Sequence, residues 1–277
     1  MRSKRWILWL FLIVGSLVML SAASVYMLVR GLNLAPPDVV SGSTLTLDMT
    51  GPLPENRLFD LSGPFFEVES VTFRDVLDAV RRAKDDSRVE NLLLHFRGTG
   101  IGWAKAGELR SALTDFVASG KKLVSYVEYG GTLDYYVACA AETIYIHPQS
   151  ILDLRGLKAE VTFMKSTLDK LGVEAEFEQI GAYKNAPDVY RRESLSEPHR
   201  EALTSIVEDL YDRLVGSIAI ARNMTDAEVY ALFDRGPFRA ADALELGLVD
   251  ELLHKDEVEA RLKADDEDFQ PLTVADY

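Results

Sequence analysis

The sequence has one cysteine and few histidines, and these shortages limit the chemistry it can carry. Cys139 is the single cysteine among 277 residues, so no internal disulfide and no cysteine-rich zinc site is expected. It lies in the apolar stretch 136–141, which predicts a small buried thiol. The four histidines are widely spaced, and the HExxH, GxSxG and GxxxxGK motifs are absent. The sequence therefore predicts neither a metal nor a cofactor, and it gives no support for a Ser-His-Asp triad.

Basic residues are also scarce relative to acidic ones. The chain has 30 Lys and Arg residues and 44 Asp and Glu residues, which gives a formal net charge of −14. A phosphate backbone would meet a repulsive field, so nucleic acid is not expected as a partner. Hydrophobic residues make up 48% of the chain, which excludes intrinsic disorder and allows a sizeable core.

The longest uncharged run lies near the N-terminus. It covers Trp6–Val29, 24 residues, and follows the basic residues Arg2, Lys4 and Arg5. At about 1.5 Å per residue, such a helix can cross a bilayer core of roughly 30 Å. Basic residues before the run predict a cytoplasmic start and an exported remainder. A cleaved signal peptide is the alternative, because Ser21–Ala23 offers small residues. The apolar residues continue to Val29, which favours an uncleaved anchor.

Composition divides the chain into four parts. Residues 1–30 form the basic end and the transmembrane anchor, and 31–43, rich in Pro, Gly and Ser, form a stalk. Residues 44–262 form an α/β domain, and 263–277 form an acidic linker toward a second domain outside this chain. Beyond residue 30 there are 26 basic and 44 acidic residues, a formal charge of −18. This charge predicts a well-solvated surface.

Hydrophobic periodicity within the α/β domain alternates between strand and helix. Thr72 with Asp75, and Thr225 with Glu228, have the spacing of helix-capping pairs. The alternation predicts a largely parallel sheet flanked by helices. The predicted strands are 44–49, 91–96, 122–127, 143–146, 173–180 and 248–252. The predicted helices begin near 72, 109, 130, 161, 196, 225 and 239, and residues 50–70 are predicted as loop.

Lys184 attracts attention because it follows a predicted strand. Open α/β sheets commonly place their sites at the carboxyl ends of strands. A lysine acts as a general base only when neutral, which requires desolvation or nearby positive charge. Arg191 and Arg192 are close enough in sequence to supply that charge. An ordinary solvated surface lysine is the alternative interpretation.

The segment Gly181–Ala186, Gly-Ala-Tyr-Lys-Asn-Ala, resembles the Gly-x-Tyr-Lys-Ser-Ala segment of signal peptide peptidase A. This family comprises membrane-anchored serine peptidases of bacteria. Three further stretches resemble the same family, and together they cover about residues 40–255. These stretches are 135–148, 168–173 and 243–252. The resemblance implies a Clp protease/crotonase-like fold.

The resemblance also implies a Ser-Lys dyad in which Lys184 is the general base and backbone N–H groups hold the oxyanion. In the short form of the family, the nucleophile lies three residues before a pair of tyrosines. Thr132 occupies that position here. An intact lysine without a serine resembles the N-terminal half of the long, two-domain form, in which the second half supplies the nucleophile. Thr132 as a surrogate nucleophile is the less favoured alternative.

Several expectations about the whole protein follow from this resemblance. The substrates are residual signal peptides or other membrane peptides, and the chain forms a homo-oligomer with a Ser-bearing second domain. The location is the bacterial inner membrane, crossed once, with most of the chain outside the cytoplasm. A catalytically silent scaffold with the same fold is the alternative function. An acyl-CoA enzyme of the crotonase type conflicts with an exported location, where CoA is scarce.

Two neighbouring segments have both a functional and a simpler interpretation. Gly98–Gly102 has the composition of a turn that places amide groups near substrate, but such turns are more often only turns. Asp188–Glu193 is placed to orient Lys184, although charged loops are usually only solvated.

Overall fold

The computed structural model describes residues 5–31, 39–56, 71–265 and 271–277. Residues from Val39 onward form one compact unit, and the N-terminal helix belongs to a separate unit. The strands are β1 Ser43–Gly51, β2 Val89–Thr99, β3 Lys122–Gly131, β4 Thr143–Ile146, β5 Ile151–Asp153, β6 Phe238–Arg239, β7 Glu251–Leu252 and β8 Pro271–Thr273. The helices are α1 Arg5–Gly31, α2 Phe73–Asp85, α3 Trp103–Ala118, α4 Thr132–Ala138, α5 Lys165–Leu171, α6 Asp188–Arg191, α7 Glu197–Arg222, α8 Asp226–Phe233, α9 Ala240–Glu245 and α10 Lys255–Asp265.

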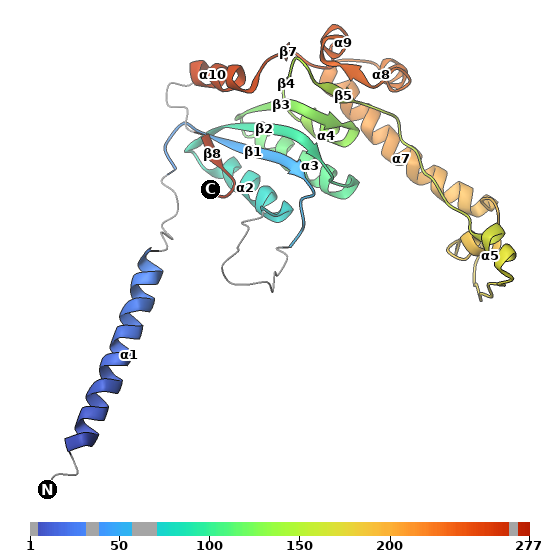
Figure 1. Ribbon diagram of the computed structural model, residues 1–277. Coiled ribbons are helices and arrows are strands. Elements are labelled where there is room, and N and C mark those ends of the chain that lie inside the picture. Colours follow the sequence, from blue (N-terminus) through green and yellow to red (C-terminus); the bar gives the residue numbers. More distant parts are fainter. Residues whose placement is uncertain (1–4, 32–38, 57–70, 266–270) are drawn as a thin grey trace. The chain divides into compact units, whose positions relative to one another are not determined.

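The N-terminal uncharged run forms the helix α1, which has 27 residues (Figure 1). Within the described ranges, no helix meets the combined length and hydropathy that crossing a bilayer requires. Most of the predicted stalk and of the predicted loop 50–70 lies outside the described residues.

The second unit is built on a largely parallel sheet, as predicted. Its strand order is β6-β5-β3-β2-β1-β8. In addition, β4 pairs with β3, and β7 pairs with β4. The pairs β1–β2, β2–β3, β3–β4, β3–β5, β4–β7 and β1–β8 are parallel, and β5–β6 is antiparallel. Parallel strands need crossover connections, and α2 and α3 supply the first two. The prediction of an α/β fold is therefore confirmed.

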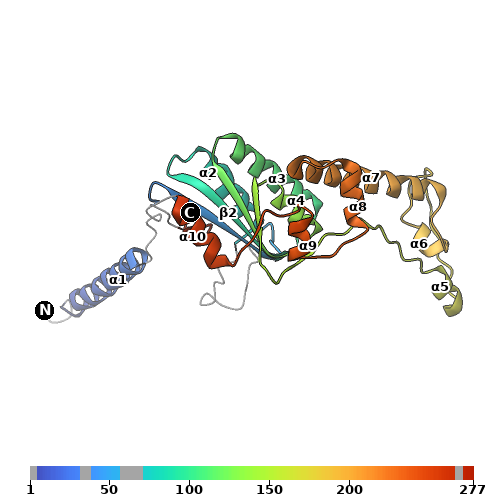
Figure 2. The ribbon, with the colours of Figure 1, turned by 90° about the horizontal axis from the view of Figure 1, so that it is seen from above.

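Alternate residues of the central strands face two different layers, because successive side chains on a strand point to opposite faces. On β2, Leu92 and Leu94 join the main core beneath α2, α3 and α4. Leu93 points the other way and joins a smaller cluster with Val258 of α10. Figure 2 shows α10 and the α2–α3 pair on opposite sides of the strands. The sheet is therefore covered on both faces.

The helix starts follow the capping signals in the sequence. Thr72 and Asp75 form a reciprocal capping box at α2, and Thr225 and Glu228 form another at α8. Each box satisfies two backbone N–H groups that the first turn leaves without partners. Ser196 is the N-cap residue of α7, as predicted.

One predicted strand is wrong. Residues 173–180 alternate between apolar and polar side chains, but they form no strand. Val173, Phe177 and Ile180 are exposed, Ile180 to 93%. A strand needs a partner for its backbone groups, and this segment pairs with none of the described strands. The predicted helix over 161–171 also begins late, at Lys165.

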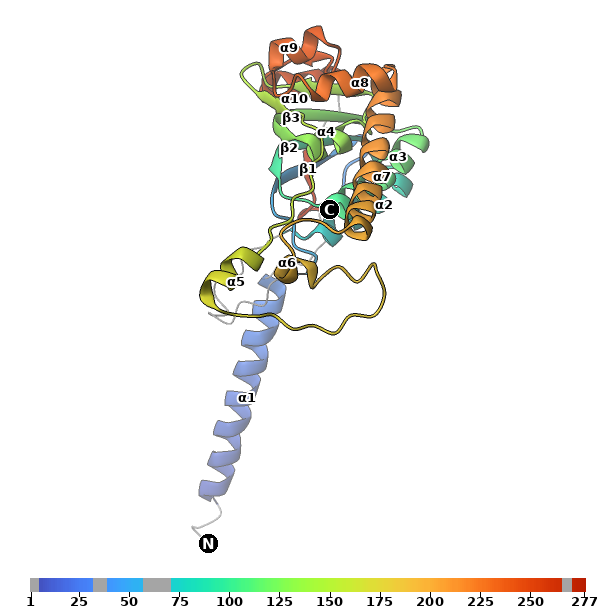
Figure 3. The same ribbon diagram turned by 90° about the vertical axis from the view of Figure 1, so that its right-hand side faces the viewer.

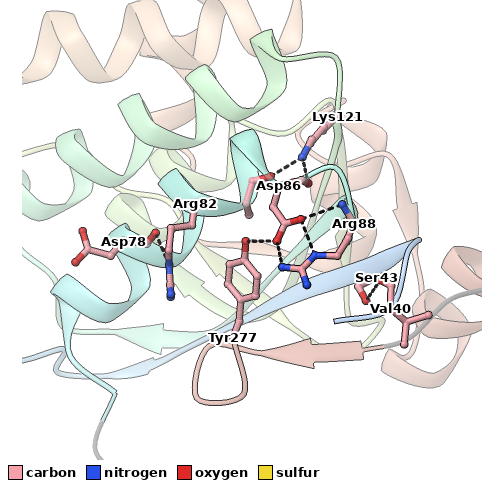
Figure 4. Close-up of polar contacts among 9 residues, drawn as sticks. Val40, Ser43, Asp78, Arg82, Asp86, Arg88, Lys121 and Tyr277 are labelled. Atoms are coloured by element: carbon pink, nitrogen blue, oxygen red, sulfur yellow. Dashed lines mark hydrogen bonds and ion pairs between the residues drawn. The ribbon is translucent and has the colours of Figure 1, made fainter. Parts of the chain in front are cut away.

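The C-terminal residues pack against the edge of the sheet (Figure 4). β8 pairs with β1, and Leu272 is buried. The Tyr277 hydroxyl donates to Asp86 Oδ2 at 3.1 Å, and the Arg82 guanidinium lies 4.9 Å from the centre of its ring. Burial and the adjacent Asp86 carboxylate raise the pKa of Tyr277 to about 12. Arg88 donates to the same carboxylate at 2.8 Å, and this bond is the main cause of the lowered pKa of Asp86.

Candidate active site

Lys184 lies on the loop between α5 and α6, and its side chain is exposed. Its backbone N–H donates to Gly181 O at 3.3 Å, and Gly181 has φ +94°, a conformation that favours glycine. Figure 3 shows this long loop beside the start of α7. Because residues 173–180 form no strand, Lys184 does not lie at the carboxyl end of a sheet strand.

We call residues 165–210, which comprise α5, α6, the loop between them and the first half of α7, the arm. We call the sheet and the helices packed on it the body. Figures 1 and 2 show α5 and α6 beyond the edge of the sheet. Among residues 165–210, all of which the structure describes, Asp188 has the only buried side chain. Arg191 and Arg192, the predicted neighbours of Lys184, are exposed.

An open cavity of about 680 Å³ lies on the arm. Its walls combine the stacked rings of Phe177 and Tyr190, whose centroids are 5.6 Å apart, with the charged side chains of Lys165 and Arg191. Lys184 is not among its lining residues. The cavity therefore does not by itself form a site around the lysine.

Thr132, at the family's nucleophile position, begins α4 in the body. Its hydroxyl accepts the N–H of Arg155 at 2.9 Å and donates to Arg155 O at 3.0 Å. Both functions of the hydroxyl are therefore used by the backbone that follows β5. A nucleophilic hydroxyl needs an adjacent base. Lys184 lies on the arm rather than among the groups bonded to Thr132.

The Asp134 carboxylate lies close to Thr132 in sequence and binds two backbone amide groups. It accepts the N–H of Gly131 at 2.9 Å and the N–H of Thr99 at 3.3 Å, and it also binds the Thr99 hydroxyl. Asp134 is buried, and burial raises its pKa. Gly131 precedes α4, and Thr99 is the last residue of β2, within the glycine-rich segment 98–102. This segment therefore does bring an amide group to the start of α4, and the chain's own carboxylate uses it.

The close packing of Asp134 depends on Gly130. A Cβ atom added there would lie 3.3 Å from Asp134 Cβ and 3.1 Å from Val127 Cγ1. Backbone N–H groups at such a position can stabilise an oxyanion only when they are free to bind it. This pair already binds a carboxylate, so the body offers no free pair of donors at Thr99 and Gly131.

The structure also joins three ionisable residues that lie far apart in the sequence. Buried His95 on β2 contacts Asp48 Oδ1 of β1 through Nδ1 at 2.8 Å and Glu128 Oε2 of β3 through Nε2 at 2.9 Å. The hydrogen bond with His95 is the main cause of the lowered pKa of Asp48. The three residues share the sheet face that α10 covers. Their separation in sequence hides this contact, which depends on strand order.

The other histidines do not form a metal site. The rings of His147 and His254 meet edge to face at 4.9 Å, and His199 Nδ1 lies 3.7 Å from Asp188 Oδ2. In the ranges that the structure covers, no three His, Cys, Asp or Glu side chains are grouped to hold a metal ion.

Comparison with known proteins defines the class of this chain. The model of peptidase family S49 matches residues 115–268, more than half of the sequence. The chain therefore belongs to peptidase family S49. This membership confirms the predicted relationship to a peptidase family.

Individual relatives confirm the resemblance to signal peptide peptidase A. The chloroplastic serine protease SPPA of Arabidopsis thaliana is 29% identical over 182 residues, 66% of this chain and 27% of that protein. Protease 4 of Salmonella typhi is 28% identical over 237 residues, 79% of this chain and 38% of that protein. The chain thus spans well under half the length of these relatives.

Among solved structures, the 1510-N membrane-bound stomatin-specific protease matches with a TM-score of 0.46 and 10% identity. The match covers 80% of this chain and 84% of that one. A likeness at this level does not define a fold family. The Clp protease/crotonase-like assignment therefore stays a prediction.

Proposed function

We propose that this chain supplies Lys184 as the general base of a Ser-Lys dyad endopeptidase that cleaves residual signal peptides in or at the membrane. The observation that carries the proposal is the segment Gly181–Ala186, which resembles the lysine segment of the family, with Asn185 in place of a serine, and lies on an exposed loop. In the proposed assembly, contact with the serine-bearing domain desolvates the Lys184 amine and favours its neutral form. The neutral amine takes the proton of a serine hydroxyl as that hydroxyl attacks the peptide carbonyl. Exposure leaves the amine open to a nucleophile from outside the arm.

The nucleophile is proposed to come from a second, Ser-bearing peptidase domain, in an assembly of several copies. Two features of the body support this arrangement. Thr132 replaces the family serine and its hydroxyl is bonded to the backbone of Arg155. Asp134 occupies the amide groups of Thr99 and Gly131. The body is therefore poorly suited to hold the reacting carbonyl, and the proposal assigns that task to the second domain.

A membrane anchor at the N-terminus is part of the same proposal. The uncharged run Trp6–Val29 follows three basic residues and lies within α1. An anchor of this orientation places the peptidase domain outside the cytoplasm of a bacterial cell, close to apolar substrates. The full chain is expected to resist alkaline carbonate extraction from membranes, whereas a variant without residues 1–30 is expected to be extracted. Equal extraction of both would contradict the anchor.

A catalytically silent scaffold is the second candidate function. The amide groups filled by Asp134 and the absence of the family serine at position 132 favour it. It differs from the peptidase proposal in one respect that can be measured: the scaffold does not need the Lys184 amine.

The deciding experiment compares Lys184→Ala with Lys170→Ala in the full protein, together with the domain that supplies the serine. Both lysines are exposed on the arm, so the second variant controls for the loss of a positive charge. Cleavage of a fluorogenic peptide with an apolar segment is expected to fall by about 1,000-fold or more in Lys184→Ala, because the general base is lost. Lys170→Ala is expected to retain wild-type cleavage. Equal activity of Lys184→Ala and the wild type would favour the scaffold.

A further inference from the structure

Asp188 is a buried carboxylate in the arm, where no other side chain is buried. Its side chain is 7% exposed, although it lies only four residues after Lys184. A carboxylate loses favourable hydration on burial, so it is rarely buried without partners that compensate. The position of Asp188 therefore calls for an explanation in terms of its contacts.

The contacts of Asp188 join the lysine loop to the start of α7. Ser196 Oγ donates to Asp188 Oδ2 at 2.6 Å, and His199 Nδ1 lies 3.7 Å from the same oxygen. Ser196 is the N-cap residue of α7, and His199 lies in its first turn. His199 is also largely buried, with 13% of its side chain exposed. A short hydrogen bond to an ionised acceptor is stronger than one between neutral groups.

The backbone between Lys184 and Asp188 is short, so contacts that hold Asp188 also restrict the position of Lys184. Asp188 N–H donates to Asn185 O at 2.9 Å, which closes a turn immediately after the lysine. Val189 O accepts the N–H of Met164 at 2.7 Å, which ties the other side of Asp188 to the segment before α5. Lys184 therefore directly precedes a turn whose far end, at Asp188 and Val189, is held by contacts with other segments.

A second contact holds the other side of Lys184, but it is exposed. The Tyr183 hydroxyl donates to Glu201 Oε2 at 2.7 Å, and the Tyr183 side chain is 60% exposed. Water competes for exposed polar contacts, so their net contribution is small. The part-buried Asp188–Ser196 contact is accordingly the stronger of the two that flank the lysine.

We propose that Asp188, through its contact with Ser196 at the start of α7, is a positioning residue that fixes the loop from which Lys184 reaches the reacting hydroxyl. This inference rests on the proposed function of Lys184 and adds a residue to it. A general base must lie within hydrogen-bond reach of the proton it takes, and a misplacement of about 1 Å can lower the rate by 100-fold. Asp188 touches neither substrate nor nucleophile in this role. Its effect is on kcat rather than on binding.

The test measures kcat and KM of the full protein, together with the serine-bearing domain, for Asp188→Asn and Ser196→Ala. Asp188→Asn is expected to lower kcat by about 10- to 100-fold while KM changes by less than about twofold. Ser196→Ala is expected to lower kcat in the same direction by a smaller factor, and Asp188→Glu to recover part of the loss. Asp209→Asn on the exposed part of α7 is the matched control and is expected to keep wild-type kinetics.

A second readout does not depend on peptidase activity. Acetylation by an N-hydroxysuccinimide ester, followed by peptide mass spectrometry, gives the rate at Lys184 relative to Lys170. Asp188→Asn is expected to change this ratio by about twofold or more, because the loop presents Lys184 differently, while Asp209→Asn leaves it unchanged. A fold defect would change the reactivity of many lysines, whereas loss of positioning changes that of Lys184.

The results separate this inference from the proposed function. An unchanged kcat or an unchanged acetylation ratio in Asp188→Asn overturns the positioning role, even if Lys184→Ala is inactive. A fully active Lys184→Ala overturns the general-base role itself, whatever the result at Asp188. A fall in kcat with a preserved KM, a changed ratio at Lys184 and partial recovery in Asp188→Glu support the inference.

Discussion

The body and the arm contain apolar residues at similar spacing, but only the body buries them. α7 passes through both regions and shows the contrast within one helix. Leu214 and Ile218 near its C-terminal end are buried in the main core, whereas Ile206 in the arm is 57% exposed. The same periodicity therefore gives fully buried apolar residues in one half of the helix and only partly buried or exposed ones in the other. Periodicity predicts which face of a helix is apolar, but it does not tell where the covering surface comes from.

The largest difference in stability between the two regions is expected from Ile218→Ala and Ile206→Ala, which make the same substitution at two positions on α7. Ile218 is fully buried, so its truncation leaves a cavity and is expected to lower the free energy of unfolding by about 2–5 kcal/mol. Ile206→Ala is expected to change it by less than about 0.5 kcal/mol. Urea unfolding at constant m-value measures both. A large effect of Ile206→Ala in the isolated chain would show that the arm is covered by its own residues.

A smaller contrast is expected between the ion pairs Arg222–Asp250 in the body and Lys165–Asp169 on the arm. The Arg222 side chain is 8% exposed and binds both Asp250 oxygens, at 2.8 and 3.0 Å, and Asp250 also accepts the Ile144 N–H. Asp250→Asn is therefore expected to lower the free energy of unfolding by about 1–3 kcal/mol. Asp169→Asn breaks a pair that is exposed on both sides and is expected to lower it by less than about 0.5 kcal/mol.

The Asp250 effect also has a defined pH dependence. Burial alone would raise the pKa of Asp250, but the hydrogen bonds from Arg222 and the Ile144 amide outweigh it, and the pKa is lowered from its ordinary value of 3.8. A lowered folded-state pKa stabilises the fold above the unfolded value, and this stability is lost as pH falls through the folded value. The difference between wild type and Asp250→Asn is expected to be full at pH 7 and to shrink below about pH 4. A difference that grows in acid would contradict this assignment.

The smallest contrast concerns two tyrosine hydroxyls bonded to carboxylates. Tyr277→Phe removes the bond to Asp86 at the sheet edge and is expected to lower local stability by about 0.5–1.5 kcal/mol, seen as faster amide exchange in residues 271–277. Tyr183→Phe removes the exposed bond to Glu201 and is expected to leave the exchange of α7 amides within about twofold of the wild type. Equal changes in amide exchange at the two sites would contradict the expected difference in stability between the body and the arm.

Much of the body could be predicted from sequence because its signals are local. Each capping pair, at Thr72 and at Thr225, spans only three residues. The first strand alternates between polar and apolar residues over 44–49, and the second carries the apolar run Leu92–Leu94. The strand predicted at 173–180 failed for a different reason. Its alternation is regular, but a strand also requires a neighbour, and no local pattern reports whether one is available.

The candidate site was partly visible in the sequence. Lys184 was found through its segment, but its place on an exposed loop was not, because that depends on how α5, α6 and α7 pack. Asp134 was missed, although a carboxylate three residues after Gly131 is a spacing that favours capping of a helix start. The contact of His95 with Asp48 and Glu128 needs the order β1-β2-β3, which only the sheet provides.

The length of α7 has a mechanical consequence for the loop attached to its first turn. With 26 residues and about 1.5 Å per residue, α7 is a rod roughly 39 Å long. If it pivots as a rigid body about its buried end, a rotation of only about 5° moves the opposite end by about 3 Å, an amplification set by this length. A side chain changed beneath Leu214 or Ile218 would thus shift the amine of Lys184 without touching any residue near it. Substitutions in the core, far from Lys184, are accordingly able to change the rate of the proposed reaction.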